Sequence, residues 1–204
     1  EQDRESVPNK KVTVVRGGVD YPEILPEAIE KKYEAIYIGR LHTQKGLIEL
    51  ITIWDLVIII KPYAKLAIVG DGPLENRIRD EIYMRSLDDN IDMLGYLEGD
   101  ALKKVIMQSQ ICIHPAVYDS GGIACCQAMA YGLPAVGFDL EAYKTYYPYG
   151  MIEVHDLKDF SYWINQLLDD KNFYILMSMD ARKWASENSW PKMIERVNAE
   201  LYTD

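Results

Sequence analysis

The sequence has few cysteines and an excess of acidic over basic residues, and each shortage argues against a class of protein. It contains three cysteines, Cys112, Cys125 and Cys126. An odd number at this spacing fits no zinc or redox motif, so we expect reduced thiols in the core of a cytoplasmic protein. The 22 basic residues face 32 acidic ones, which gives a net charge of −10. This balance argues against a nucleic-acid partner, which would need a basic surface.

The sequence also lacks a membrane-spanning segment, a secretion signal and a metal-binding motif. Its longest apolar stretch, residues 47–60, is interrupted by Glu49 and Asp55 and is shorter than the roughly 20 residues that span a bilayer. Its three histidines are scattered without the spacing of metal ligands, so we predict no metal site. The chain starts without Met and its residues 1–10 are polar. We expect a piece of a longer cytoplasmic protein, at most peripheral at a membrane.

Short apolar runs alternate with helical patterns over most of the chain. The runs predict strands at Val12–Val15, Ala35–Ile38, Leu66–Val69, Ile91–Leu94, Ile111–Ile113, Ala135–Phe138 and Met151–Val154. The intervening patterns predict helices at Gly46–Lys61, Leu74–Ser86, Asp100–Gln108, Ile123–Tyr131 and Glu141–Tyr146. Continuous apolar runs are typical of strands buried on both faces. The alternation therefore predicts an α/β fold, a Rossmann-like parallel sheet in three α/β/α layers.

The C-terminal part of the chain has a different pattern. From Asp156 to Tyr202 the sequence reads as three helices, for which Asp156, Asp170 and Ser189 are suitable N-caps. We therefore divide the chain into residues 1–32, a linker with the remnant of a preceding domain, residues 33–155, the core, and residues 156–204, helices that pack on the core.

Glycines follow four of the predicted strands. In a doubly wound sheet, ligands bind beyond the carboxyl ends of the strands. Three of these strands lead directly into Gly39, Gly70 and Gly95, and the fourth leads through a loop to Gly121 and Gly122. Because the carboxyl ends of parallel strands meet at one edge, we expect these loops to converge on a single ligand site.

The loop before residue 123 has the features of a phosphate site. It ends in Asp119, Ser120, Gly121 and Gly122, and an Ala-rich helix follows from Ile123. Paired glycines let backbone amides approach an anion closely, and the first helical turn directs unpaired N–H groups at it. The alternative is an ordinary helix start, capped by Ser120 or Asp119.

Two cations stand in the loop after the strand that ends at Ile38. Arg40 and Lys45 flank a turn that opens a helix, and together they could neutralise a diphosphate. The alternative is that both are solvated surface cations. Residues 70–73 form a turn in either case, because Gly and Pro set its dihedral angles. His114, at a strand end, either lines the pocket or makes a local hydrogen bond.

Four motifs in this order resemble a known family: YIGRLHTQKG, LAIVGDGP, MLGYLEGD and ICIHPAVYDSGGIACCQAMAYGLPAV. Together they are similar to the C-terminal donor-binding domain of family 4 retaining glycosyltransferases (glycosyltransferases group 1), the C-terminal half of a GT-B fold. The resemblance covers about Tyr33 to Phe138, and Val12–Asp20 resembles the end of the preceding domain. It implies transfer of a hexose from a nucleotide-diphosphate sugar, UDP- or GDP-linked, with retention and without metal or other cofactor. An acceptor glycan or lipid would bind an N-terminal domain outside this chain, so we expect the fragment alone to be inactive.

The resemblance also assigns roles to individual residues. It places Arg40, Lys45 and Asp119 at the reacting diphosphate and sugar. It assigns donor binding to Gly39, Gly70, Tyr96, Leu97, Gly121, Gly122, Ile123 and Gln127. In this scheme the loop of Tyr96 and Leu97 lies by the base, and amides from Gly121 to Ile123 meet phosphate and sugar. Gln127, in the second turn of the helix, reaches the ribose.

The sequence departs from the family pattern at two places. The family has two Glu residues separated by seven others, where this chain has Asp119 and Gln127. A neutral amide in place of a carboxylate should cost about 1 kcal/mol of nucleotide affinity. The family's glycine pair after the next strand is absent from residues 139–143. These departures leave open weakened donor binding, altered donor choice or loss of catalysis, the last in a degenerate, inactive nucleotide-sugar-binding module. An unrelated nucleotide-binding α/β protein is a separate alternative, against which Arg40, Lys45 and the Gly121–Gly122 helix start argue.

The tryptophans of the C-terminal helices have two possible interpretations. Trp163, Trp184 and Trp190 either mark a contact with the missing domain or belong to ordinary helix-packing faces.

Overall fold

A computed structural model describes residues 17–25, 27, 29–119, 121–141, 143, 147 and 149–202. The expected strand Val12–Val15, most of the expected helix Glu141–Tyr146 and the possible cap Ser120 lie outside the described residues. The strands are β1 (Tyr33–Ile38), β2 (Leu66–Val69), β3 (Ile91–Gly95), β4 (Ser109–His114), β5 (Ala135–Phe138) and β6 (Met151–Val154). The helices are α1 (Leu47–Ile60), α2 (Glu75–Met84), α3 (Gly99–Met107), α4 (Ile123–Ala130), α6 (Leu157–Asp169), α7 (Lys171–Glu187) and α8 (Trp190–Tyr202), with a 3-10 turn at Thr43–Lys45.

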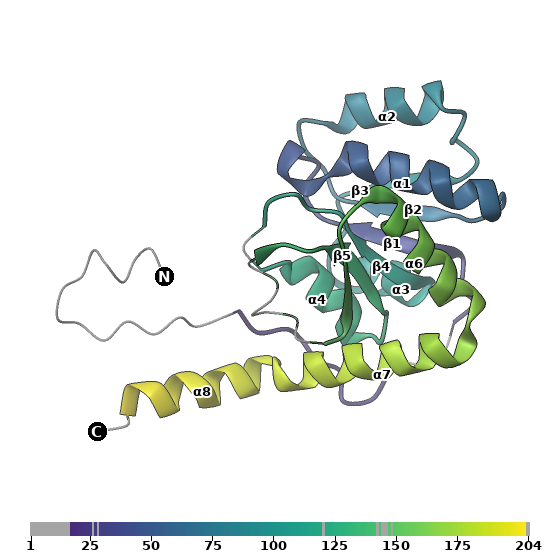
Figure 1. The fold of residues 1–204 in the computed structure, drawn as a ribbon. Helices are drawn as coiled ribbons and strands as arrows, with labels where there is room; N and C mark the ends of the chain where they lie inside the picture. The colour runs from purple at the N-terminus through teal and green to yellow at the C-terminus, as the bar shows by residue number, and fades with distance from the viewer. Residues whose placement is uncertain are drawn as a thin grey trace.

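The six strands form one parallel sheet in the order β3-β2-β1-β4-β5-β6 (Figure 1). From β1 the chain builds outward through β2 to β3, and it then returns to add β4, β5 and β6 on the other side. The order thus reverses between β1 and β4. In such a sheet the loops after these two strands diverge and leave a crevice for ligands.

Two hydrophobic clusters cover the two faces of the sheet, because side chains alternate along each strand. Ala35 and Tyr37 of β1 point into one cluster, with side chains of α1, α2 and α6. Ile36 and Ile38 point into the other, with side chains of α3, α4 and α7. The predicted three-layer α/β/α architecture is therefore confirmed. Cys112, Cys125 and Cys126 are buried free cysteines, as expected.

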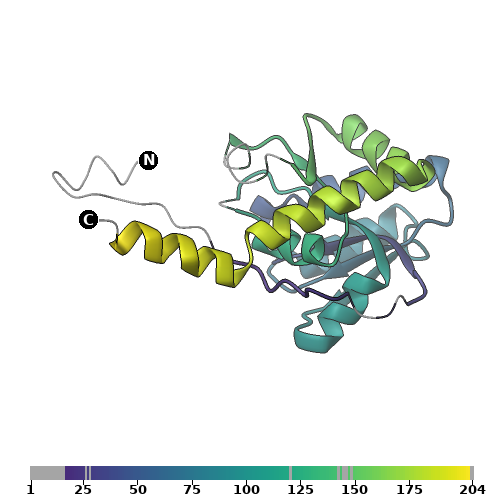
Figure 2. The same ribbon diagram turned by 90° about the horizontal axis from the view of Figure 1, so that it is seen from below.

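Three helices follow β6, as the sequence predicts. Asp156 caps α6 through the amides of Lys158 and Asp159, and Asp170 caps α7 through those of Asn172 and Phe173. In Figure 2, α8 continues beyond α7 and extends past the sheet. No helix within the described part of the chain combines the length and apolarity needed to cross a membrane.

The tryptophans of these helices have different surroundings. Trp184 is buried and stacks on Tyr147, with ring centroids 5.0 Å apart. Trp163 is partly buried against the α1 side of the core. Trp190 is 50% exposed and starts α8 next to an isolated bridge between Val19 and Ser189, which the sequence did not predict. Helix packing therefore accounts for the first two.

Candidate functional site

Two adjoining cavities lie at the carboxyl ends of the central strands. The first, of about 350 Å³, opens between the loops after β1 and β4 and is lined by Gly17, Ile38, Gly39, Arg40, Lys45, His114, Asp119, Gly121, Gly122, Ile123 and Ala124. The second, of about 210 Å³, is lined by Ile38, Gly39, Arg40, Val69, Gly70, Asp71, Tyr96 and Leu97. Residues 38–40 border both cavities, so one elongated ligand could occupy the two together.

Backbone contacts hold the loops after β1 and β4 against each other. The carbonyl of Gln44 accepts hydrogen bonds from the amides of Val117 (3.0 Å) and Tyr118 (3.2 Å). Gly46 follows in a left-handed conformation (φ +66°), and a Cβ there would lie 1.8 Å from the carbonyl oxygen of Pro115. Only glycine permits this approach, and it brings Lys45 next to the loop that follows β4.

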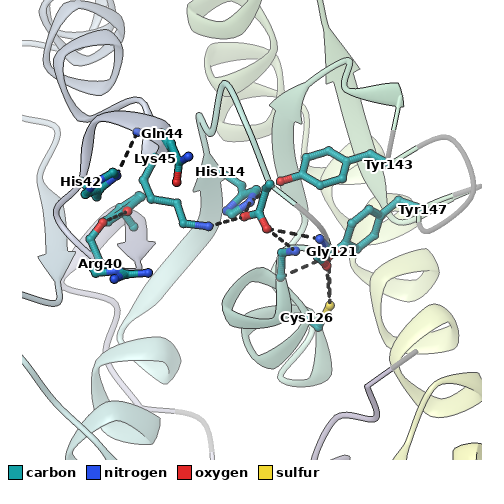
Figure 3. A network of polar contacts seen from close by, with 12 residues as sticks. Arg40, His42, Gln44, Lys45, His114, Gly121, Cys126, Tyr143 and Tyr147 are labelled. Atoms are coloured by element: carbon teal, nitrogen blue, oxygen red, sulfur yellow. Dashed lines mark hydrogen bonds and ion pairs between the residues drawn. The ribbon is translucent and has the colours of Figure 1, made fainter. Parts of the chain in front are cut away.

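The carboxylate of Asp119, which lines the first cavity, is the centre of a polar network. Figure 3 shows the partners Lys45, His114 and Gly121. Lys45 Nζ lies 2.7 Å from Oδ2, and His114 Nε2 lies 3.0 Å from the same oxygen. The amides of Gly121 and Gly122 donate to Oδ1 over 3.2 and 3.3 Å. The Asp119 side chain is only 8% exposed, so these protein groups take the place of water around its charge.

The network fixes the charge state of this carboxyl group. Burial alone would raise the pKa of Asp119, but hydrogen bonds from His114, Lys45 and the amide of Gly121 outweigh it and hold the pKa well below its ordinary value. Asp119 is therefore an anion throughout the physiological range, and it is a poor proton acceptor.

Two tyrosines that follow β5 support the same turn from behind. The hydroxyl of Tyr143 is 2.5 Å from His114 Nε2 and also hydrogen-bonds Asp119. Tyr147 donates to the carbonyl of Gly121 over 2.7 Å, and its hydroxyl lies 3.0 Å from Cys126 Sγ. Burial raises the pKa of both tyrosines well above the ordinary value, so both hydroxyls remain protonated donors.

The sequence analysis did not assign Tyr143 or Tyr147 to the site. The available signal was a pair of tyrosines four residues apart after a buried strand, since hydroxyls that become buried require partners. His114 combines both of the alternatives considered for it: it lines the cavity and its ring makes local hydrogen bonds.

The structure brings most of the predicted site residues together. Arg40 and Lys45 line the first cavity with the start of α4. Arg40 is exposed at the junction of the two cavities, and no described side chain forms an ion pair with it. Gly70, Tyr96 and Leu97 line the second cavity, and Gly39 lines both.

In the structure the glycine turn makes a contact close to the alternative stated for it, a helix start capped by Asp119. The amides of Gly121 and Gly122 do hold an anion, but that anion is the carboxylate of Asp119. Asp119 comes two residues before Gly121, and its short side chain reaches these local donors, as Asp does at helix starts. Ile123 and Ala124, the first two residues of α4, also line the cavity, and amides of a first helical turn have no intrahelical partner.

Gln127 and metal binding are the remaining points of the sequence analysis. Gln127 lies half-buried in the second turn of α4 and is not among the described residues that line the two cavities. Its contact with a ribose stays a prediction. Over the residues that the structure describes, no cluster of three or more His, Cys, Asp or Glu side chains is arranged to hold a metal ion.

The sequence of this chain is similar to those of several glycosyltransferases. An uncharacterized glycosyltransferase of Methanocaldococcus jannaschii is 34% identical over 101 residues, which cover 50% of this chain and 26% of the relative. Poly(glycerol-phosphate) alpha-glucosyltransferase of Bacillus subtilis is 27% identical over 177 residues, which cover 81% of this chain and 25% of the relative. The chain thus spans about a quarter of the length of each relative.

Solved structures show the same fold. A variant of TarM from S. aureus, in complex with Fondaparinux, alpha-GlcNAc-glycerol and UDP, superposes with a TM-score of 0.83 at 19% identity, over 99% of this chain and 42% of that one. The pneumococcal O-GlcNAc transferase GtfA, in complex with UDP and GlcNAc, superposes with a TM-score of 0.79 at 18% identity, over 91% of this chain and 38% of that one.

The family model that describes glycosyl transferases group 1 matches residues 25–184, which include every strand of the sheet and both cavity-lining loops. The chain belongs to the glycosyl transferases group 1 family.

Proposed function

We propose that this chain binds a UDP-sugar across the two cavities and serves the transfer of its hexose to an acceptor with retention of configuration. One observation carries the proposal: Arg40, Lys45 and the start of α4 line one cavity at the switch point of the sheet. Gly39 and Arg40 border both that cavity and a second one, and a diphosphate between a sugar and a nucleoside requires two such neighbouring cavities.

The chemistry follows from the charges around the first cavity. Negative charge accumulates on the diphosphate as the bond to the sugar breaks. The guanidinium of Arg40 and the ammonium of Lys45 are placed to stabilise that charge, together with the first-turn amides of Ile123 and Ala124. These fixed cations and amides are proposed to do what a metal ion does in other transferases.

The second cavity is proposed to hold the nucleoside. Tyr96 is 64% exposed at its rim, and Leu97 and Val69 supply apolar surface for a base. We propose uracil as the base because similar structures, including those of TarM and GtfA, are complexes with UDP. The acceptor is proposed to bind a part of the protein outside this chain.

A second candidate function is a nucleotide-sugar-binding module without turnover. It is favoured by the state of Asp119, whose oxygens are engaged by protein donors, and by the neutral Gln127. In this case UDP would bind, but no sugar would be released or transferred.

Calorimetric titration with UDP, GDP and ADP tests the proposal. We expect UDP to bind, and we expect Arg40→Met and Lys45→Met each to weaken it about tenfold or more, because each variant removes a charge-assisted contact. Lys61→Met is the matched control: Lys61 follows the far end of α1 and pairs with Asp169, so its loss should leave UDP affinity unchanged. Absence of UDP binding, or binding that ignores both site variants, would contradict the proposal. Release of UDP from UDP-glucose by the full-length protein then separates the enzyme from the inactive module.

A further inference from the structure

Lys45 faces two competing anions once a diphosphate is bound. Its ammonium already lies 2.7 Å from the carboxylate of Asp119, and the proposed function requires it to contact the donor as well. An ammonium has three N–H donors and can serve two anions. However, a buried carboxylate that had few other hydrogen-bond partners would hold the Lys45 ammonium tightly, because little water is present to take the place of the ammonium.

Other donors meet most of the hydrogen-bonding capacity of Asp119. The amides of Gly121 and Gly122 donate to Oδ1. His114 Nε2 shares Oδ2 with Lys45, and Tyr143 adds its hydroxyl to the same carboxylate. Asp119 therefore keeps its charge satisfied even when Lys45 turns part of its hydrogen-bonding capacity toward the cavity.

Burial and ring packing fix the positions of the two side-chain donors, His114 and Tyr143. His114 is 3% exposed and Tyr143 is fully buried. Their ring centroids lie 5.6 Å apart, and Tyr143 packs edge-on against Tyr147 at 5.4 Å. In Figure 3, Lys45 approaches the network from the left and Tyr143 from the right, with His114 between them.

We propose that Tyr143 and His114 are positioning residues for donor binding, which satisfy the carboxylate of Asp119 and so leave Lys45 available to the diphosphate. This inference rests on the proposed function. Neither residue needs to touch the reacting atoms, because both act through Asp119 and Lys45.

Removal of the Tyr143 hydroxyl tests the inference. We expect Tyr143→Phe to weaken UDP binding about five- to tenfold in calorimetry, since loss of one charge-assisted hydrogen bond is of that order. Tyr174→Phe is the matched control, because its hydroxyl donates to the carbonyl of Gln110 (3.0 Å) away from both cavities; it should bind UDP as the unmodified chain does.

A double-mutant cycle separates positioning from simple structural support. In a Lys45→Met background, Tyr143→Phe should change UDP affinity less than twofold, because the cation through which it acts is gone. A full five- to tenfold loss in that background would overturn the inference, and so would unchanged affinity of Tyr143→Phe in the unmodified chain.

A second pair of variants keeps the test decisive if Tyr143→Phe does not fold. His114→Gln retains an N–H donor near the position of Nε2, whereas His114→Leu lacks one. We expect the first to bind UDP within about twofold of the unmodified chain and the second to lose about fivefold; equal affinities would overturn the inference. If the unmodified chain itself fails to bind UDP, the proposed function fails instead, and the two failures are thereby distinguished.

Discussion

At the scale of single residues, Asp119 places a negative charge beside the cavity proposed for a diphosphate. The protein neutralises that charge locally, through Lys45, His114 and two backbone amides. The turn before α4 is consequently organised by a side chain of its own loop. Beside this arrangement, Arg40, Lys45 and Ile123 line the cavity proposed for the ligand.

The depressed pKa of Asp119 gives its contribution to stability a defined pH dependence. Burial opposes ionisation, but His114 and Lys45 lower the folded-state pKa below the unfolded value of about 3.9. The stabilisation is therefore present above about pH 4 and is lost as pH falls toward the folded-state pKa. We expect Asp119→Asn to cost about 3 kcal/mol of unfolding free energy at pH 7, measured by urea denaturation. The difference should persist at pH 5 and decline below about pH 4; a difference already gone at pH 5 would contradict this account.

Gly122 is the second residue on which the turn depends. It has φ +57°, and a Cβ there would lie 2.9 Å from the Tyr147 hydroxyl and 3.1 Å from His114 Nε2. We expect Gly122→Ala to cost about 2–3 kcal/mol in urea denaturation, from left-handed strain plus the clash. Gly99→Ala is the control: Gly99 has φ +55° with open space around it, so strain alone should cost about 1 kcal/mol. If Gly122→Ala and Gly99→Ala lowered the unfolding free energy equally, the packing of Tyr147 and His114 against Gly122 would not contribute to the stability of the turn.

At the scale of elements, α7 supports the site from a distance. It packs against α4, and its Trp184 stacks on Tyr147, which holds the carbonyl of Gly121. The start of α7 depends on Asp170, whose carboxylate accepts from two backbone amides over 2.9 Å each.

Asp170→Ala removes this cap. We expect it to lower the unfolding free energy by about 1 kcal/mol, because two amides of the first turn lose their acceptor. The measurement is urea denaturation at pH 7, and Asp170→Ser, which preserves a capping oxygen, should recover most of the loss. Equal stability of the Ala and Ser variants would contradict the capping role.

The elements also show what local sequence can predict. β2, β5 and β6 have the predicted bounds, since short apolar runs between glycines and polar residues leave little choice of structure. Glycines after parallel strands predicted that the loops converge, and the loops after β1 and β4 do line one cavity. The sequence left open whether the amides of Gly121 and Gly122 meet Asp119 or a ligand, because this choice depends on side-chain conformation. Tyr143 and Tyr147 reach the turn through packing across 20 or more residues of chain, which no local pattern specifies.

At the scale of the whole molecule, the account depends on a sheet whose order reverses between β1 and β4. This reversal separates the two loops enough to leave a cavity, and the Gln44 contacts keep them close enough to share a ligand. The chain carries a net charge of −10, so an anionic donor must be attracted locally, by Arg40, Lys45 and the start of α4.

A crystal structure of this chain with UDP tests the central claim most directly. The account predicts that the diphosphate lies in the 350 Å³ cavity, in contact with Arg40, Lys45 and the amide of Ile123, and that the uracil lies beside Leu97. A diphosphate bound elsewhere, such as in the groove lined by Tyr21 and Trp190, or bound without contact to either cation, would contradict it.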